Sequence, residues 1–131
     1  MSEHHNCPFC RNRNIVVENE LAYADYDTYP ASPGHCLVIT RRHVAEYFQA
    51  TAEEKAAIWA LVDEMKPIID AEYQPDAYNV GVNIGKTAGQ SVPHVHIHLI
   101  PRYKGDVENP QGGVRGVIPH RQKYQRKVRT P

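Results

Sequence analysis

Residues 90–100 of the chain are Gln-Ser-Val-Pro-His-Val-His-Ile-His-Leu-Ile, in which three histidines alternate with aliphatic residues. This period of two predicts a strand with one apolar face and one face that carries His94, His96 and His98. At a rise of ~3.3 Å per residue, neighbouring rings are about 6.6 Å apart and the outer two about 13 Å, so the outer pair cannot share one small target. A single strand histidine is ordinary, but three in alternation indicate a shared chemical task.

The spacing favours a division of labour in which His96, the middle ring, acts and its neighbours serve other partners. A histidine is a nucleophile at neutral pH when the nitrogen that faces the substrate is unprotonated, and a backbone carbonyl that holds the other nitrogen's proton fixes that state. Paired strand histidines also bind catalytic zinc in other proteins, so a metallohydrolase that activates water remains an alternative.

The segments around this strand predict an α+β domain. Strand patterns fall at residues 15–17, 21–24, 35–39 and 78–84. A capping box of Thr51 and Glu54 opens a helix whose apolar stripe continues to Tyr73, and Pro67 inside that stripe predicts a kink or a break. Short links and this order of elements favour a mostly antiparallel sheet of about five strands with one long helix packed on it.

The composition describes one ordinary domain that spans residues 1–131. The chain has a formal net charge of +0, 41% hydrophobic residues and 23% charged residues. This balance disfavours nucleic acid and anionic membranes as partners, and no apolar run reaches the roughly 20 residues that cross a bilayer. Because the opening Met1-Ser2-Glu3 lacks a signal-peptide pattern, we expect a cytoplasmic protein.

Cys7 and Cys10 have the spacing of a metal-binding Cys-x-x-Cys pair. Tetrahedral zinc needs two more ligands, and the pattern alone leaves paired free thiols as an alternative. His4 and His5 lie close enough in the sequence to compete for the site.

The stretch at residues 90–100 closely resembles the signature of the histidine triad family of nucleotide hydrolases and transferases. The Pro-Gly-His at residues 33–35, the loop at residues 83–89 and the Cys-x-x-Cys pair follow in the family's order. The resemblance covers about residues 7–102 and leaves residues 103–131 as a basic carboxy-terminal extension. It implies a HIT-like fold whose sheet continues across a homodimer, with Trp59 either in that interface or in the core.

The resemblance also implies roles for particular residues. His96 would attack the α-phosphorus of a nucleotide to form a nucleotidyl-histidine intermediate, oriented by the carbonyl of His94, and no catalytic metal would be required. His98 and His35 would lie near the phosphate. Asp27 would bind the ribose hydroxyls, although an Asp at this position is also a common turn residue. The positions that match the phosphate and leaving-group side are Asn83, Gly89, Gln90 and Ser91.

For the metal, the resemblance implies that His43 and His94 complete a Cys₂His₂ set with Cys7 and Cys10. Such a set has no open position, so we expect one structural zinc per chain, with His4 or His5 as competitors of His43.

The resemblance implies cleavage of the α-phosphate linkage of dinucleoside polyphosphates such as diadenosine tetraphosphate. An adenosine phosphoramidase of the same family and a non-catalytic nucleotide sensor remain alternatives. Residues 112–119 have the spacing of a short strand and resemble the ending of bacterial diadenosine polyphosphate hydrolases, which predicts that Arg115 approaches the polyphosphate. A solvated basic tail is the alternative for this segment.

Overall fold

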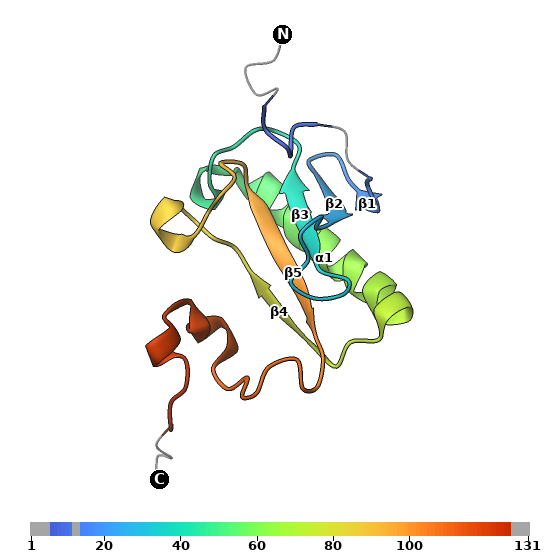
Figure 1. The fold of residues 1–131 in the computed structure, drawn as a ribbon. Coiled ribbons are helices and arrows are strands. Elements are labelled where there is room, and N and C mark those ends of the chain that lie inside the picture. The colour runs from blue at the N-terminus through green and yellow to red at the C-terminus, as the bar shows by residue number, and fades with distance from the viewer. Residues whose placement is uncertain (1–5, 12–13, 127–131) are drawn as a thin grey trace, which may run out of the picture.

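The computed structural model describes residues 6–11 and 14–126. Its centre is one antiparallel sheet with the strand order β1-β2-β3-β5-β4, and the long helix α1 covers one face of it (Figure 1). This confirms the predicted α+β fold. The elements are β1 (Val17–Glu18), β2 (Ala22–Tyr26), β3 (Cys36–Thr40), α1 (Ala52–Tyr73), β4 (Ala77–Gly81) and β5 (His96–Arg102).

The predicted capping box starts α1. The Thr51 hydroxyl accepts a hydrogen bond from the Glu54 amide at 3.0 Å, and the Glu54 carboxylate accepts one from the Thr51 amide at 2.9 Å. From there the apolar stripe packs on the sheet. Its fully or nearly fully buried members are Ile58, Leu61, Val62, Met65 and Ile69.

Pro67 does not break α1, which continues to Tyr73. The proline lies on the exposed side, where the carbonyl that loses its amide partner belongs to exposed Asp63 and can bond to water. Met65 and Ile69 anchor the helix on both sides of the proline. Of the predicted kink or break, the break is therefore wrong and the kink stays a prediction.

The carboxy-terminal segment also differs from its prediction. Residues that were predicted as a short strand form a 3-10 helix, η3 (Gly113–Val117). Gly112 and Gly113 have φ values of 87° and 42°, a left-handed backbone that turns the chain away from an extended path. Figure 1 shows this segment beside β4.

The sheet face opposite α1 carries the polar residues of β5. In the register of β3 and β5, His96 lies opposite Ile39 and His98 opposite Leu37. His94 lies two residues before the first residue of β5, and its ring, like that of His96, packs edge-on against Phe9. The part of the chain that the structure describes contains no helix long and apolar enough to cross a membrane.

Candidate active site and metal centre

His96 is held in a defined orientation on the open face of the sheet. Its Nδ1 lies 2.8 Å from the carbonyl oxygen of His94, which accepts the Nδ1 proton. The ring is 6% exposed and packs edge-on against Phe9, with 4.8 Å between the ring centroids. Because a neutral imidazole carries one proton, this contact leaves the lone pair on Nε2.

A cavity of about 280 Å³ lies in front of this ring. One part of its wall is formed by the apolar side chains of Pro8, Phe9, Leu37 and Val92, and another part by polar side chains. The predicted site residues that line it are Asp27, Asn83, Ser91, His96 and His98. We call it the catalytic cavity; it combines an apolar wall with a few convergent polar groups, as small-molecule sites do.

Gly89 and Gln90 lie beside the catalytic cavity without lining it. The side-chain oxygen of Gln90 accepts a hydrogen bond from the backbone amide of Gly85 at 2.9 Å. Its side-chain nitrogen donates to the backbone carbonyls of Ala45 and Val92 at 2.7 and 3.0 Å. Gly89 has a φ of 99°, which favours glycine for its backbone rather than for space, since a Cβ there would meet nothing within 4 Å. Both residues therefore shape the loop that leads to Ser91.

His35 and His98 form a hydrogen-bonded pair. The amide of Ala31 donates to His35 Nδ1 at 2.9 Å, which puts the proton of His35 on Nε2. This Nε2 lies 3.0 Å from His98 Nδ1 and 3.6 Å from a carboxylate oxygen of Asp27. His98 Nδ1 is then the acceptor, so His98 carries its own proton on Nε2 and can donate it to a group in the catalytic cavity.

Both members of this pair are neutral at pH 7. Desolvation, reinforced by the neighbouring His96 and His35, lowers the pKa of His98 to about 4, although Asp27 opposes the shift. Desolvation also lowers the pKa of His35, again against the charge of Asp27. A neutral His98 is a hydrogen-bond donor without a full positive charge.

The ligand atoms of Asp27, His35 and His98 lie within 4.8 Å of one another, which is close enough for a metal ion. The proton position opposes this use, because the Ala31 amide keeps the lone pair of His35 on Nδ1 and leaves none on the Nε2 that faces the other two ligands. This arrangement disfavours the alternative of a zinc hydrolase built on paired histidines.

A second cluster has the donor set of structural zinc. The ligand atoms of Cys7, Cys10, His43 and His94 all lie within 4.8 Å of one another. His94 Nδ1 is 3.4 Å from Cys7 Sγ and 3.5 Å from Cys10 Sγ, and His43 Nδ1 is 3.1 Å from Cys10 Sγ. Tetrahedral zinc would separate such atoms by about 3.5 Å, from bond lengths of ~2.3 Å to sulfur and ~2.0 Å to nitrogen.

Two further observations fit a metal in this cluster. The opposite nitrogen of His94, Nε2, lies 2.7 Å from the Thr40 carbonyl, which is the outer hydrogen bond that metal-bound histidines usually make. Burial, together with the adjacent Cys7 thiol, raises the pKa of Cys10 to about 11, so a cation is needed to hold the Cys10 sulfur as a thiolate. His4 and His5, the predicted competitors, lie outside the described residues.

The Cys-x-x-Cys loop also belongs to the catalytic cavity. Pro8 and Phe9 lie between the two cysteines and line that cavity, and the Tyr23 hydroxyl holds the Phe9 carbonyl at 2.7 Å. These wall residues were missed from the sequence. The signal that could have found them is their position between two cysteines that share a cluster with His94, which lies two residues before His96.

Arg115 is not directed at His96. Its guanidinium donates to the carbonyls of Arg121 and Gln122 at 2.9 and 3.3 Å and stacks over the Tyr124 ring at 4.5 Å. It braces the carboxy-terminal segment, so residues 111–124 of the extension are held by internal hydrogen bonds and are not a solvated tail.

Comparison with known proteins leads to the family whose signature lies at residues 90–100. A family model described as HIT domain matches residues 11–105. A bis(5'-adenosyl)-triphosphatase of Dictyostelium discoideum is 36% identical over 99 residues, which cover 76% of this chain and 66% of the relative. An AP-4-A phosphorylase of Mycobacterium tuberculosis is 37% identical over 93 residues, which cover 70% of this chain and 48% of the relative. The chain therefore spans about half to two thirds of the length of these curated relatives.

Two solved structures are similar in fold. A HIT family protein from Bacillus anthracis superposes with a TM-score of 0.72 at 36% identity, covering 78% of this chain and 77% of the other. A zinc-bound histidine triad family protein from Mycobacterium smegmatis superposes with a TM-score of 0.70 at 29% identity, covering 76% of this chain and 77% of the other.

Proposed function

The chain belongs to the histidine triad family, and on that premise we propose that it is an enzyme that cleaves the α-phosphate linkage of dinucleoside polyphosphates through a nucleotidyl-histidine intermediate. The observation that carries the proposal is the 2.8 Å contact between His96 Nδ1 and the His94 carbonyl. It keeps the lone pair of His96 on Nε2, the nitrogen that an attack on phosphorus requires.

The first step forms a bond between His96 Nε2 and the α-phosphorus and breaks the bond from that phosphorus to the bridging oxygen of the leaving phosphate. The electron pair stays on the leaving oxygen, whose charge is stabilised by the Nε2 proton of His98. In the second step, water or another acceptor attacks the phosphorus and the phosphorus–nitrogen bond breaks. His96 then regains its lone pair, and the proton of the acceptor passes to solvent.

The other side chains of the catalytic cavity suit a nucleotide. Asp27 offers two carboxylate oxygens to the two hydroxyls of a ribose. Asn83 and Ser91 can donate to phosphate oxygens, so that positioning and hydrogen bonding supply much of the catalysis. Phe9 and Leu37 offer apolar surface for a base.

The metal in this proposal is structural. Zinc held by Cys7, Cys10, His43 and His94 would fix the loop that carries Phe9, and it would have no open position for substrate. The single domain of residues 1–131 would act as a homodimer on nucleotide substrates.

The test is a trapped covalent adduct. Wild-type protein is quenched in acid-free denaturant during turnover of diadenosine tetraphosphate with a labelled α-phosphate, and the label is mapped by mass spectrometry to the peptide that contains His96. His96→Ala should lose the adduct and more than about 10³-fold in kcat, because the nucleophile is removed. His120→Ala, an exposed histidine outside the cavity, is the control and should keep both.

Turnover that persists in His96→Ala would contradict the proposal. Adduct formation without later release of AMP would instead favour a slow nucleotidyl transferase that lacks its acceptor, and binding without any chemistry would favour the nucleotide sensor.

A further inference from the structure

A second cavity of about 530 Å³ adjoins the catalytic cavity. Asn83 and His98 line both, so the two cavities meet at the ring that follows His96 on the strand face. Beyond His98 the second cavity continues along β5 to Ile100, which lies about 13 Å from His96 by the strand rise of ~3.3 Å per residue. Its far wall comes from Val114 and Val117 of the carboxy-terminal extension.

This far wall belongs to a segment that is held in place by its own hydrogen bonds. Residues 110–124, which we call the carboxy-terminal lobe, are closed by hydrogen bonds from the Gln111 side chain to the Tyr124 carbonyl and from the Gln122 side chain to the Gln111 carbonyl. A Cβ at Gly112 would lie 2.0 Å from the Gln122 carbonyl oxygen, so only glycine fits there. The braced lobe presents Val114 and Val117 with 59% and 73% of their surface exposed.

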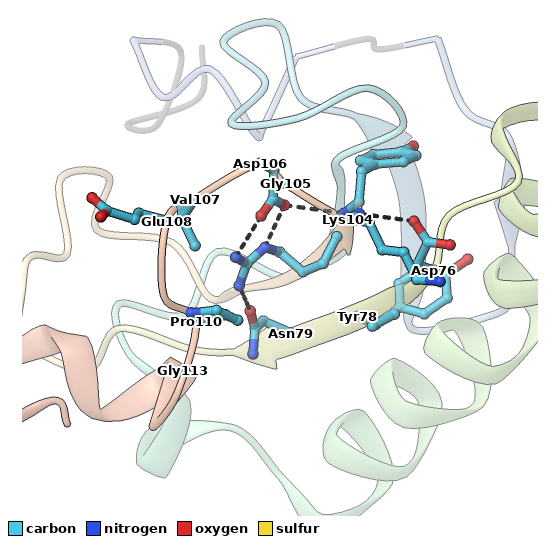
Figure 2. A pocket seen from close by; sticks show the side chains of 13 residues that line it. Asp76, Tyr78, Asn79, Lys104, Gly105, Asp106, Val107, Glu108, Pro110 and Gly113 are labelled. Carbon is cyan, nitrogen blue, oxygen red and sulfur yellow. Dashed lines mark hydrogen bonds and ion pairs between the residues drawn. The ribbon is translucent and has the colours of Figure 1, made fainter. Parts of the chain in front are cut away.

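The second cavity also contains a polar group in a defined orientation. Arg102 donates to Oδ1 of Asn79 at 2.6 Å and makes two further hydrogen bonds to Asp106 (Figure 2). Because Oδ1 is the acceptor, the Asn79 amide directs its Nδ2 toward Gly113, where a Cβ would be 3.2 Å away. At this end of the cavity a ligand would therefore meet the Asn79 Nδ2 donor beside the apolar side chains of Ile100, Val114 and Val117.

We propose that the second cavity binds the second nucleoside of a dinucleoside polyphosphate, the part that leaves with the released phosphates. This inference rests on the proposed function. A purine or pyrimidine base has apolar faces for Ile100, Val114 and Val117 and edge acceptors for Asn79 Nδ2. A bridge of several phosphates between two nucleosides can pass His98, which lines both cavities.

The experiment compares substrates with and without a second nucleoside. The kcat/KM for diadenosine tetraphosphate is divided by that for adenosine 5′-phosphoramidate, which has the same α-phosphorus and adenosine but a leaving group without a nucleoside. The double variant Val114→Asn/Val117→Asn should lower this ratio about tenfold, the effect of losing roughly one apolar side-chain contact. Val107→Asn changes an exposed valine that does not line the second cavity, and it should leave the ratio unchanged.

A binding measurement supplies a second readout. Adenosine 5′-tetraphosphate and diadenosine tetraphosphate differ only by the second adenosine, and wild type should be inhibited more strongly by the latter when the phosphoramidate is the substrate. The double variant should remove most of this difference.

The outcomes separate the two proposals. If wild type cleaves diadenosine tetraphosphate but the double variant keeps the wild-type ratio, the second cavity is not a nucleoside site and the proposed function stands. If wild type does not cleave diadenosine tetraphosphate, the proposed function and this inference both fall. A change in the mass of the double variant by light scattering, with an unchanged ratio, would assign the cavity to another copy of the chain and overturn the inference.

Discussion

The chemistry of the site depends on where single protons lie on three imidazoles. The His94 carbonyl accepts a hydrogen bond from His96 Nδ1, which keeps the proton of His96 on that nitrogen. The Ala31 amide keeps the proton of His35 on Nε2, and this proton in turn keeps the proton of His98 on Nε2. The result is one ring with its lone pair toward the cavity and one ring with its proton toward it. A nucleophile and a donor for the leaving oxygen are thus produced from the same residue type by two backbone contacts and the hydrogen bond between His35 and His98.

The buried His98 predicts a particular dependence of stability on pH. An unfolded histidine titrates near pH 6.5, whereas the folded His98 has a pKa of about 4, so below pH 6.5 the unfolded state binds a proton that the folded state excludes. The contribution of His98 is complete above pH 6.5 and is lost as the pH falls toward 4. Between pH 7 and pH 5 the free energy of unfolding should drop by about 1–2 kcal/mol from this residue.

Urea unfolding of wild type and His98→Gln at pH 7 and pH 5 measures this effect, since the variant should show the smaller drop. Comparing the drop in the free energy of unfolding between the two proteins cancels the effect of acid on the zinc ligands, which both proteins share. An equal drop in both proteins between pH 7 and pH 5 would mean that His98 titrates normally in the folded protein.

Sequence reasoning found His96 and set His94 beside the two cysteines, but it did not find where β5 begins. Alternation placed His94 on the strand with His96 and His98, whereas the strand begins only at His96. A period of two cannot report where a strand begins. Phe9 was missed because its contacts with His94 and His96 join residues more than 80 positions apart, which no local pattern encodes.

Among the elements, α1 was the most predictable, since its capping box and its stripe are local signals. Thr51→Ala removes the hydroxyl that accepts from the Glu54 amide, and should lower the free energy of unfolding by about 1 kcal/mol. Thr87→Ala, at an exposed threonine outside α1, is the matched control and should change it by less than about 0.5 kcal/mol. Chemical denaturation of the three proteins gives the comparison, and an equal loss in both variants would exclude a specific capping effect.

The path of the chain through the carboxy-terminal lobe could not be predicted from local sequence patterns. Its valines have strand-like spacing, but the path of the chain is set by left-handed glycines and by Gln122, which contacts residues about ten positions earlier in the sequence. The same reasoning explains why Arg115 was expected near phosphate. Its charge is visible in the sequence, whereas the two carbonyls that hold it are not.

The loop between the two cysteines predicts that the metal affects nucleotide binding as well as stability. Wild type should contain one zinc per chain, and Cys7→Ser should contain little, unfold at lower temperature and bind AMP more weakly, because Phe9 loses its support. Elemental analysis, thermal unfolding and AMP titration measure the three effects. Cys36→Ala removes a buried thiol outside the cluster and should keep the zinc. Zinc-free wild type with freely alkylated Cys7 and Cys10 would contradict the prediction.

For the whole molecule, we expect one edge of the sheet to form the contact between two copies. β4 pairs with β5 on one side, and β5 is its only strand neighbour in the described residues. An edge strand exposes unpaired amides and carbonyls, which a second copy can pair in the antiparallel sense. A chain of 131 residues also gains burial from a partner. The alternative contact is the helix face at Trp59, which is 38% exposed and donates to the Tyr47 hydroxyl at 3.2 Å.

We therefore expect a homodimer with a twofold axis, formed through β4, and light scattering at micromolar concentration should give twice the chain mass of 14.9 kDa. Trp59→Ala separates the two contacts, because pairing through the strand edge should keep the doubled mass and packing through the helix face should not. Hydrogen exchange at residues 77–81 gives an independent measure: amides paired across the interface should exchange more slowly at high protein concentration than after dilution. A single-chain mass at every concentration would contradict the dimer.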